Sequence, residues 1–414
     1  MKFSGLLLCI LAAATALHAQ EPATEDALLP YVQVLRDRGE SPRDYVLEQL
    51  QRHDLLIFDD ALHSAVEPFD FYRELVADTA FTRLVSCIFL EVIPVNRQQC
   101  LDAYMTSVPE QPELLYPAFQ DDFSGFGWPY QTYFDLLHAV YTANRTLPEK
   151  ERLRVIAVSN PAYWCDLQAP ADVDQFRKGL AGRDYDMYKQ IMAGLDNFRS
   201  GKKGVFLTNT RHAYTGIKRR DGAYFWDTGT FFRQWHPHKT VSIRFHGPAL
   251  YMEARRTEGS TPATTEGMEQ FSYRWGRMAD GLWDRAFEAL GNRPLAVPLA
   301  GTAFGRDTYV GNHMVSCAPG QTMSDAYDAV IFLAPLEKWR KCAVTDAIYT
   351  PPFRREMVRR YRLLRTAEQM KREFEEYAVD SIEALIDSFC VPVPEKPLPQ
   401  AQSLTTTADK RAGS

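Results

Sequence analysis

The side chains best suited to chemistry in this 414-residue chain come directly after an apolar run, Leu55 to Phe58. Asp60, His63 and Glu67 follow at spacings of three and four residues. An imidazole titrates near neutral pH and accepts a proton from water when a carboxylate orients it. The pattern therefore predicts a buried strand, then a helix beginning near Ala61 with His63 and Glu67 on one face, and Asp60 where the two elements meet.

A second stretch has the same build. Residues 204–208 form another mostly apolar run, and Asn209 and His212 follow it. Ligands of open α/β sheets bind at the carboxyl ends of the strands. We therefore interpret Asp60-x-x-His63 and Asn209-x-x-His212 as equivalent strand ends that face one cleft. In that cleft, His212 is a second base, a stabiliser of developing negative charge or a metal ligand.

A third carboxylate and an arginine are predicted to join this cleft. Glu91 ends the apolar run at 84–90, where a charged group is costly unless it has partners or faces a cleft. Arg183 either braces Glu91 or binds a carboxylate of the substrate, and Asp184 either pairs with Arg183 or contacts the substrate. The candidate catalytic residues are Asp60, His63, Glu91 and His212, and the candidate substrate-binding residues are Glu67, Arg183, Asp184 and Asn209.

The elements that must position these side chains alternate between strand and helix. This pattern predicts an α/β fold with a central, mostly parallel sheet flanked by helices, built from two related strand–loop–helix halves with helical additions. Helices are also expected at 268–290 and, as one long helix or a helix pair, at 353–389. Strands are expected at 55–58, 84–90, 154–158, 204–208, 240–245 and 325–335.

The ends of the chain differ in composition from the middle. Residues 1–19 contain a lysine, an apolar stretch and then small residues, which predicts a signal peptide too short to span a bilayer. We therefore expect an exported protein, periplasmic or extracellular, without a transmembrane segment. A loose leader at 20–40, a single domain at 41–390 and a disordered polar tail at 391–414 complete the predicted organisation.

Composition narrows the range of partners. A formal net charge of −6 and a pI near 5.9 argue against a nucleic-acid binder, which is normally basic. Export permits disulfides among the cysteines that follow the predicted signal peptide. Proximity favours Cys87–Cys100 and Cys317–Cys342 as pairs, with free buried thiols as the alternative.

Taken together, these motifs resemble the superfamily that joins erythromycin esterases, Tiki-type metalloproteases and ChaN-like haem-binding lipoproteins. In that superfamily one strand ends in Gly-Glu-x-x-His, later strands end in Glu and in Asn with His, and Arg-Asp/Asn-x-x-Met opens a helix. The resemblance spans about residues 41–335, with Gly-Glu replaced by Asp59-Asp60. The matching residues are Asp59-Asp60-Ala61-Leu62-His63 with Glu67, Glu91, Arg183-Asp184-Tyr185-Asp186-Met187, Asn209 with His212, and Tyr327-Asp328-Ala329-Val330-Ile331-Phe332.

The resemblance implies three functions, and the residues leave all three open. The first is hydrolysis of an ester, lactone or amide bond in a small molecule or peptide, by water that the histidine–carboxylate cleft activates. The second is the same reaction with Zn, Mn or a similar ion held by His63, His212 and Glu91. The third is a binding protein for haem, iron or a glycan, with the aromatic residues at 116–134 as the wall of its pocket.

Overall fold

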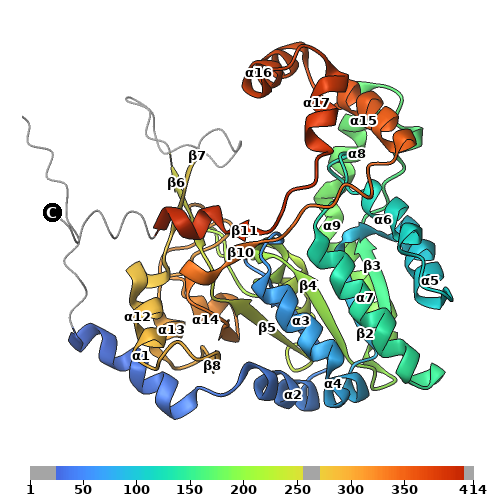
Figure 1. Cartoon of the computed structure of the whole chain (residues 1–414). Helices are drawn as coiled ribbons and strands as arrows, with labels where there is room; N and C mark the ends of the chain where they lie inside the picture. The colour runs from blue at the N-terminus through green and yellow to red at the C-terminus, as the bar shows by residue number, and fades with distance from the viewer. Residues whose placement is uncertain (1–24, 255–270, 405–414) are drawn as a thin grey trace, which may run out of the picture.

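The computed structural model describes residues 25–254 and 271–404. Its central sheet has seven strands in the order β3-β2-β4-β1-β5-β9-β8, and every neighbouring pair is parallel except β8 with β9 (Figure 1). The α/β fold with a mostly parallel sheet is thus confirmed. The strands are β1 (Leu55–Asp59), β2 (Cys87–Pro94), β3 (Arg154–Ser159), β4 (Gly204–Thr208), β5 (Thr240–Phe245), β8 (Leu295–Pro298) and β9 (Ala329–Phe332).

Strand β1 occupies the middle of the sheet because its side chains are apolar on both faces. It pairs with β4 on one side and with β5 on the other. Successive side chains of a strand point to opposite faces, so Leu56 and Phe58 pack in one core while Leu55 and Ile57 pack in the other. A continuous apolar run is what a strand buried on both faces requires.

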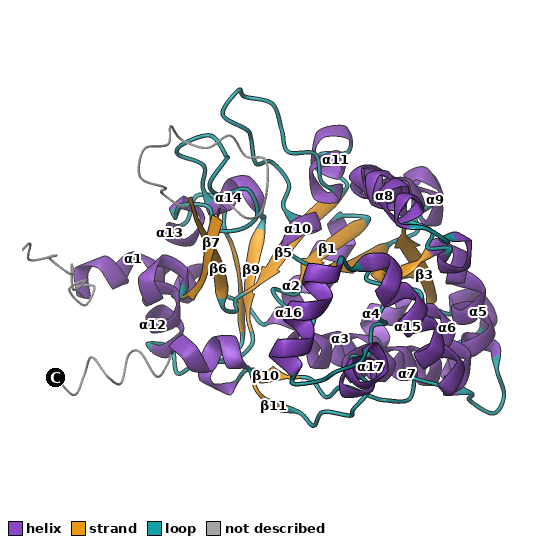
Figure 2. Cartoon of the chain, turned by 90° about the horizontal axis from the view of Figure 1, so that it is seen from above, coloured by secondary structure: helices purple, strands orange, loops and turns teal. Residues whose placement is uncertain are grey.

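Helices cover both faces of this sheet (Figure 2). The helices that pack on one face are α2 (Pro42–Arg52), α3 (Glu67–Ala77), α4 (Thr79–Leu84), α5 (Gln98–Thr106) and α7 (Gln131–Thr146). Those that pack on the other include α1 (Glu25–Arg38), α9 (Arg183–Gly194) and α12 (Leu282–Glu288). The remaining α-helices are α6 (Tyr116–Gln120), α8 (Pro170–Gly179), α10 (Thr210–Ala213), α11 (Thr228–Trp235), α13 (Ala303–Arg306), α14 (Met323–Ala326), α15 (Pro351–Leu364), α16 (Ala367–Tyr377) and α17 (Ile382–Phe389).

The chain after β1 differs from the predicted helix. Ala61 has a left-handed backbone with φ of 58°, and its N–H donates to Oδ1 of Asp59 at 2.9 Å. This contact closes a tight turn, and α3 begins only at Glu67, with Pro68 in its first turn. The prediction that His63 and Glu67 share a helix face is therefore wrong, because His63 lies in the loop before α3.

Both ends of the described chain are more ordered than their polar composition suggests. The expected loose leader contains α1, whose apolar stripe includes the fully buried Leu35. The expected disordered tail pairs β11 (Lys396–Pro397) with β10 (Arg340–Lys341) and buries Leu398. The predicted signal peptide at 1–19 and the last tail residues, 405–414, lie outside the described residues.

Two other predicted helices are corrected. From residue 271 the chain forms β7 (Phe271–Gly276), antiparallel to β6 (Ala249–Ala254), and becomes α-helical only at α12. The alternation of aromatic and polar residues in Phe271–Trp275 is the period of a strand rather than a helix. The region 353–389 divides into α15, α16 and α17 because Thr366 and Ser381 cap new helices.

The six cysteines within the described ranges are all free thiols. The expected pairs Cys87–Cys100 and Cys317–Cys342 are therefore wrong. Cys87 and Cys342 are buried, as small apolar side chains often are. In the same part of the chain, no helix is both long and apolar enough to cross a bilayer.

Candidate functional site

The register of two adjacent strands brings the predicted motifs together. β1 and β4 pair in parallel with Asp59 opposite Thr208. The residues that follow, Asp60 and Asn209, are therefore level with each other. Because parallel strands end at the same edge of a sheet, both motifs lie where ligands of α/β proteins bind.

His63 is held by hydrogen bonds to both ring nitrogens. Its Nδ1 donates to Oδ2 of Asp60 at 2.7 Å and lies 3.1 Å from the hydroxyl of Tyr133. Its Nε2 lies 2.9 Å from Nδ2 of Asn209. Since Oδ1 of Asn209 accepts the backbone N–H of Arg211, Nδ2 must be the donor to His63. In the neutral form of the ring, these contacts place the proton on Nδ1 and the lone pair on Nε2.

Nearby carboxylates make His63 a stronger base than an ordinary histidine. Burial alone would lower the pKa of its imidazole, but Asp60 and then Glu91 outweigh burial and raise this pKa to about 9. Burial raises the pKa of the Asp60 carboxyl to about 6. A ring with this pKa is mostly protonated at neutral pH, where Asp60 stabilises its charge, and the neutral form that can act as a base predominates only above about pH 9.

Glu91 is the shared partner of both predicted histidines. Its Oε2 lies 3.6 Å from Nε2 of His63, and its Oε1 lies 3.2 Å from Nε2 of His212. Arg183 donates to the same Oε1 at 3.0 Å, and the Thr208 hydroxyl donates to Oε2. Burial would raise the pKa of Glu91, but His212 and Arg183 hold it well below its ordinary value. Glu91 is thus a buried, ionised carboxylate.

A second carboxylate orients His212. The ring donates from Nδ1 to Oδ1 of Asp184 at 2.7 Å and accepts a hydrogen bond at Nε2 from Arg183 at 3.0 Å. Asp184 also accepts the backbone N–H of Thr228 at 2.8 Å. Burial would lower the pKa of His212, but Asp184 and Glu91 raise it. His212 is therefore a buried ring with both nitrogens engaged.

A cavity of about 210 Å³ opens beside His63. Polar side chains at its wall include Asn209, Arg211 and Asn312. Its apolar wall comes mainly from the β6–β7 hairpin and includes Leu250, Met252 and Trp275. His63 thus lines a space that can hold a small reacting group.

Arg244 of β5 also lines this cavity. Its Nη1 lies 3.4 Å from Oδ2 of Asp59 and 3.4 Å from the hydroxyl of Tyr327. Its Nε has no hydrogen-bond partner within the described ranges. Arg244 is therefore a buried cation at the cavity wall with one N–H donor that the described residues leave without a partner.

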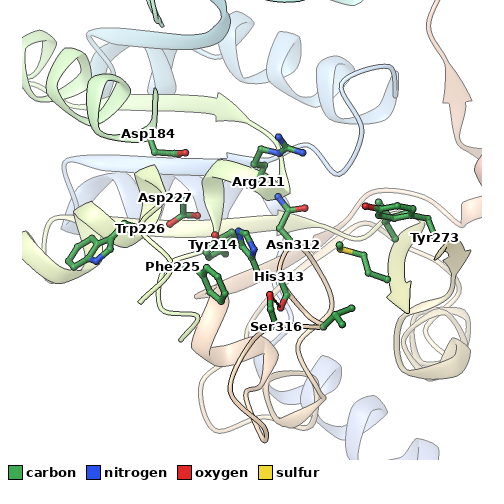
Figure 3. A pocket seen from close by; sticks show the side chains of 13 residues that line it. Asp184, Arg211, Tyr214, Phe225, Trp226, Asp227, Tyr273, Asn312, His313 and Ser316 are labelled. Atoms are coloured by element: carbon green, nitrogen blue, oxygen red, sulfur yellow. Dashed lines mark hydrogen bonds between the residues drawn. The ribbon is translucent and has the colours of Figure 1, made fainter. Parts of the chain in front are cut away.

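A larger cavity of about 650 Å³ adjoins the first (Figure 3). The two share Arg211, Leu250, Met252 and Asn312 as lining residues. The larger cavity adds aromatic and acidic side chains, namely Tyr214, Phe225, Trp226, Tyr273 and His313 together with Asp184 and Asp227. The site is therefore a two-part cleft with His63 at its smaller end.

The structure places two predicted substrate contacts elsewhere. Glu67 accepts the backbone N–H of Arg340 at 3.1 Å and its Nε at 2.9 Å, and it lines neither cavity of the cleft. Arg183 is buried and also donates to Ser159 at 3.2 Å. Of the two roles predicted for Arg183, the structure therefore favours the brace for Glu91. Asp184 and Asn209 do line the cleft.

Sequence reasoning missed three residues near His63. Tyr133 contacts its ring, Thr208 binds the shared carboxylate, and Arg244 supplies the free N–H. Arg244 carries a signal that could have found it, because it is a charged residue inside the predicted strand at 240–245, as Glu91 is in its own strand. Tyr133 carries none, since it is one of many aromatic residues in its segment.

The three residues predicted as metal ligands do converge, but their contacts do not fit a divalent cation. The guanidinium of Arg183 lies 3.0 Å from both Nε2 of His212 and Oε1 of Glu91. Asn209 directs an N–H at Nε2 of His63. A cation and an N–H donor already hold the lone pairs that a metal would need. In the part of the chain that the structure describes, no group of three or more His, Cys, Asp or Glu is arranged to hold a metal.

No protein-family model and no curated protein matches the sequence. Among solved structures, a succinoglycan biosynthesis protein superposes with a TM-score of 0.50 at 8% identity, over 75% of this chain and 97% of that one. An erythromycin esterase mutant in its open conformation gives 0.45 at 11% identity, over 70% and 92%. A Bacillus cereus protein gives 0.42 at 11%, over 75% and 97%. An erythromycin esterase is thus among the structural neighbours, as the sequence resemblance predicts, and identities this low show a shared fold alone.

Proposed function

We propose that this protein hydrolyses an ester or amide bond, with His63 as the general base that activates water. The observation that carries the proposal is the buried Asp60–His63 pair at the small end of the cleft. A carboxylate that fixes the tautomer of a histidine, and stabilises its imidazolium, is a recurrent device for taking a proton from a nucleophile. The fold shared with an erythromycin esterase is consistent with this chemistry.

In this reaction a water molecule attacks the carbonyl carbon and gives its proton to Nε2 of His63. The imidazolium then returns the proton to the leaving oxygen or nitrogen as the bond to the carbonyl carbon breaks. When the ring is neutral, above about pH 9, Asn209 donates its N–H to the same Nε2. The water must therefore replace that N–H, and the amide is left beside it as a contact for the reacting group.

The oxyanion of the tetrahedral intermediate needs hydrogen-bond donors that are already in place. Arg244 meets this need, since it lines the small cavity and its Nε has no partner among the described residues. Burial opposes its positive charge, but the Asp59 carboxylate 3.4 Å away maintains that charge. Arg211 and Asn312 are further donors at the same wall.

Glu91, Arg183, His212 and Asp184 act in this proposal as positioning residues. They form one hydrogen-bonded chain behind His63. The ionised Glu91, 3.6 Å from Nε2 of His63, favours the imidazolium that forms during the reaction. This network therefore raises the basicity of His63 and need not touch the substrate.

The test compares His63→Ala with His138→Ala, a control at an exposed histidine outside the cleft. Both are assayed against a panel of chromogenic esters, lactones and peptide amides. Loss of general-base catalysis should lower kcat by at least about 100-fold in His63→Ala, while the control keeps full activity. Turnover by wild type that survives in His63→Ala would refute the role of His63.

We also propose that the protein acts outside the cytoplasm, on the composition of residues 1–19. Fractionation of expressing cells, followed by sequencing of the mature N-terminus, tests this proposal. A mature chain that begins near residue 20 in the exported fraction supports it. Retention of an uncleaved chain in the cytoplasm would refute it.

A further inference from the structure

Four aromatic side chains form an exposed cluster beside the larger cavity, which we name the aromatic ledge. It comprises Tyr185 of α9, Trp226, and Phe231 and Trp235 of α11. Their rings pack with centroids 5.0 to 6.2 Å apart. Tyr185, Trp226 and Trp235 are nevertheless 43%, 47% and 48% exposed. Large aromatic side chains gathered on the surface indicate a binding site.

The aromatic ledge is continuous with the cleft. Trp226 belongs to the ledge and also lines the larger cavity, where its neighbour Phe225 lies as well. Figure 3 shows Trp226 and Tyr273 at opposite ends of that cavity. A ligand whose reacting bond lies near His63 can therefore extend through the cavity and leave it over aromatic ring faces.

Polar groups between these rings add a second requirement on the ligand. Asp184, Asp227, Arg211 and Asn312 line the larger cavity. Asp227 is only 2% exposed, and its Oδ2 has no hydrogen-bond partner within the described residues. A buried oxygen without a partner is costly, and this one belongs to a side chain at the wall of the cavity.

Few ligands match both features. A sugar ring has a C–H face that packs on aromatic rings and an edge of hydroxyls that binds carboxylates, amides and guanidinium groups. A phosphate-rich ligand would meet the negative charge of Asp184, and an apolar surface would leave the carboxyl oxygen of Asp227 without a partner. We propose that the larger cavity and the aromatic ledge bind a carbohydrate chain, so that the substrate is an ester or amide carried on a sugar. The second half of this statement rests on the proposed function.

Binding is measured first, apart from catalysis. The full-length His63→Ala variant is titrated with neutral and uronate-containing oligosaccharides by calorimetry and tryptophan fluorescence. Saturable binding of at least one oligosaccharide is expected. Trp226→Ala with Trp235→Ala in the same background should weaken it by at least about tenfold, because two ring contacts are lost. Tyr377→Ala removes an equally exposed aromatic side chain on α16 and should leave binding unchanged.

Three results would overturn the inference. One is the absence of binding to every oligosaccharide. Another is binding that the ledge substitutions leave intact while circular dichroism shows all variants folded. The third is wild-type self-association, seen by sedimentation, that the ledge substitutions abolish, because a second copy would then cover the ledge.

Hydrolysis provides the separate test of the combined proposal. With sugar esters, Trp235→Ala should raise KM, whereas with small chromogenic esters it should leave KM and kcat unchanged, because Trp235 lines neither cavity. Sugar binding without hydrolysis of any ester or amide by wild type would refute the proposed function and leave the ligand class standing. Hydrolysis of small esters without sugar binding would support the proposed function and refute the inferred ligand class.

Discussion

Replacing Asp60 with asparagine should remove most of the enhanced basicity of His63. The Asp60 carboxylate lies 2.7 Å from Nδ1 of His63, and the His63 side chain is only 13% exposed. In the native protein the pKa of His63 is raised from 6.5 to about 9. A difference of roughly 2.5 pKa units corresponds to about 3 kcal/mol of preference for the charged ring, and Asp60 is the largest source of it.

In Asp60→Asn the burial of His63 remains while the nearest negative charge is gone. The pKa of His63 should therefore fall by about 2 units or more, to its ordinary value or below. The assay is an NMR titration of the labelled histidine rings, with the His63 resonance assigned from the spectrum of His63→Ala. Asp186→Asn, at a half-exposed carboxylate paired with Lys189, is the matched control and should leave the titration of His63 unchanged.

The same substitution should also change how the free energy of unfolding depends on pH. Because the pKa of His63 is raised in the folded protein, its protonation contributes stability that is complete below the unfolded value near 6.5 and is lost as the pH rises through about 9. Wild type should therefore lose stability to urea between these two pH values, and Asp60→Asn should lose much less. A wild-type ring that titrates below 7, or a variant ring that still titrates near 9, would refute the reasoning.

Three further predictions concern the surroundings of this pair. Glu91→Gln should lower the free energy of unfolding by about 3–5 kcal/mol, because it leaves the buried Arg183 without its ionised partner; a loss in urea denaturation below about 1 kcal/mol would contradict the network. Asn209→Ala should raise the pKa of His63 further, since the amide N–H stabilises the neutral ring, and the acidic limb of the pH–rate profile should move to higher pH; a shift to lower pH would mean that the amide accepts rather than donates. Glu67→Gln should cost about 1–3 kcal/mol of stability through its contacts with β10 and leave kcat unchanged; a large loss of kcat at unchanged melting temperature would restore Glu67 to the site.

The sequence predicts which side chains lie together where polar residues interrupt or follow apolar runs. Such runs become strands buried on both faces, and a charged or polar residue in that setting needs partners. This reasoning places Asp60 and Asn209 level on adjacent strands and brings Glu91 between His63 and His212. It errs by a few residues for Glu91, which lies inside β2 rather than at its end.

The features that the sequence did not predict depend on contacts between distant segments. Glu67 leaves the site because a left-handed turn at Ala61 replaces the first turns of the expected helix. Tyr133 reaches His63 across 70 positions of sequence, and no local pattern distinguishes it from other aromatic residues. The β6–β7 hairpin, which walls the small cavity, was predicted in part as a helix. Tertiary contacts decide each of these cases.

The side chain of Asn209 links two parts of the site through one planar group. Its Oδ1 caps α10 through the N–H of Arg211, and its Nδ2 holds the lone pair of His63. Because the amide group is planar, Asn209 cannot turn its Nδ2 away from His63 and keep its Oδ1 on the N–H of Arg211. Breaking of the Asn209–His63 hydrogen bond and fraying of α10, which carries His212, are therefore coupled. Hydrogen exchange at the amide of Arg211 should therefore report how often Asn209 releases Nε2 of His63.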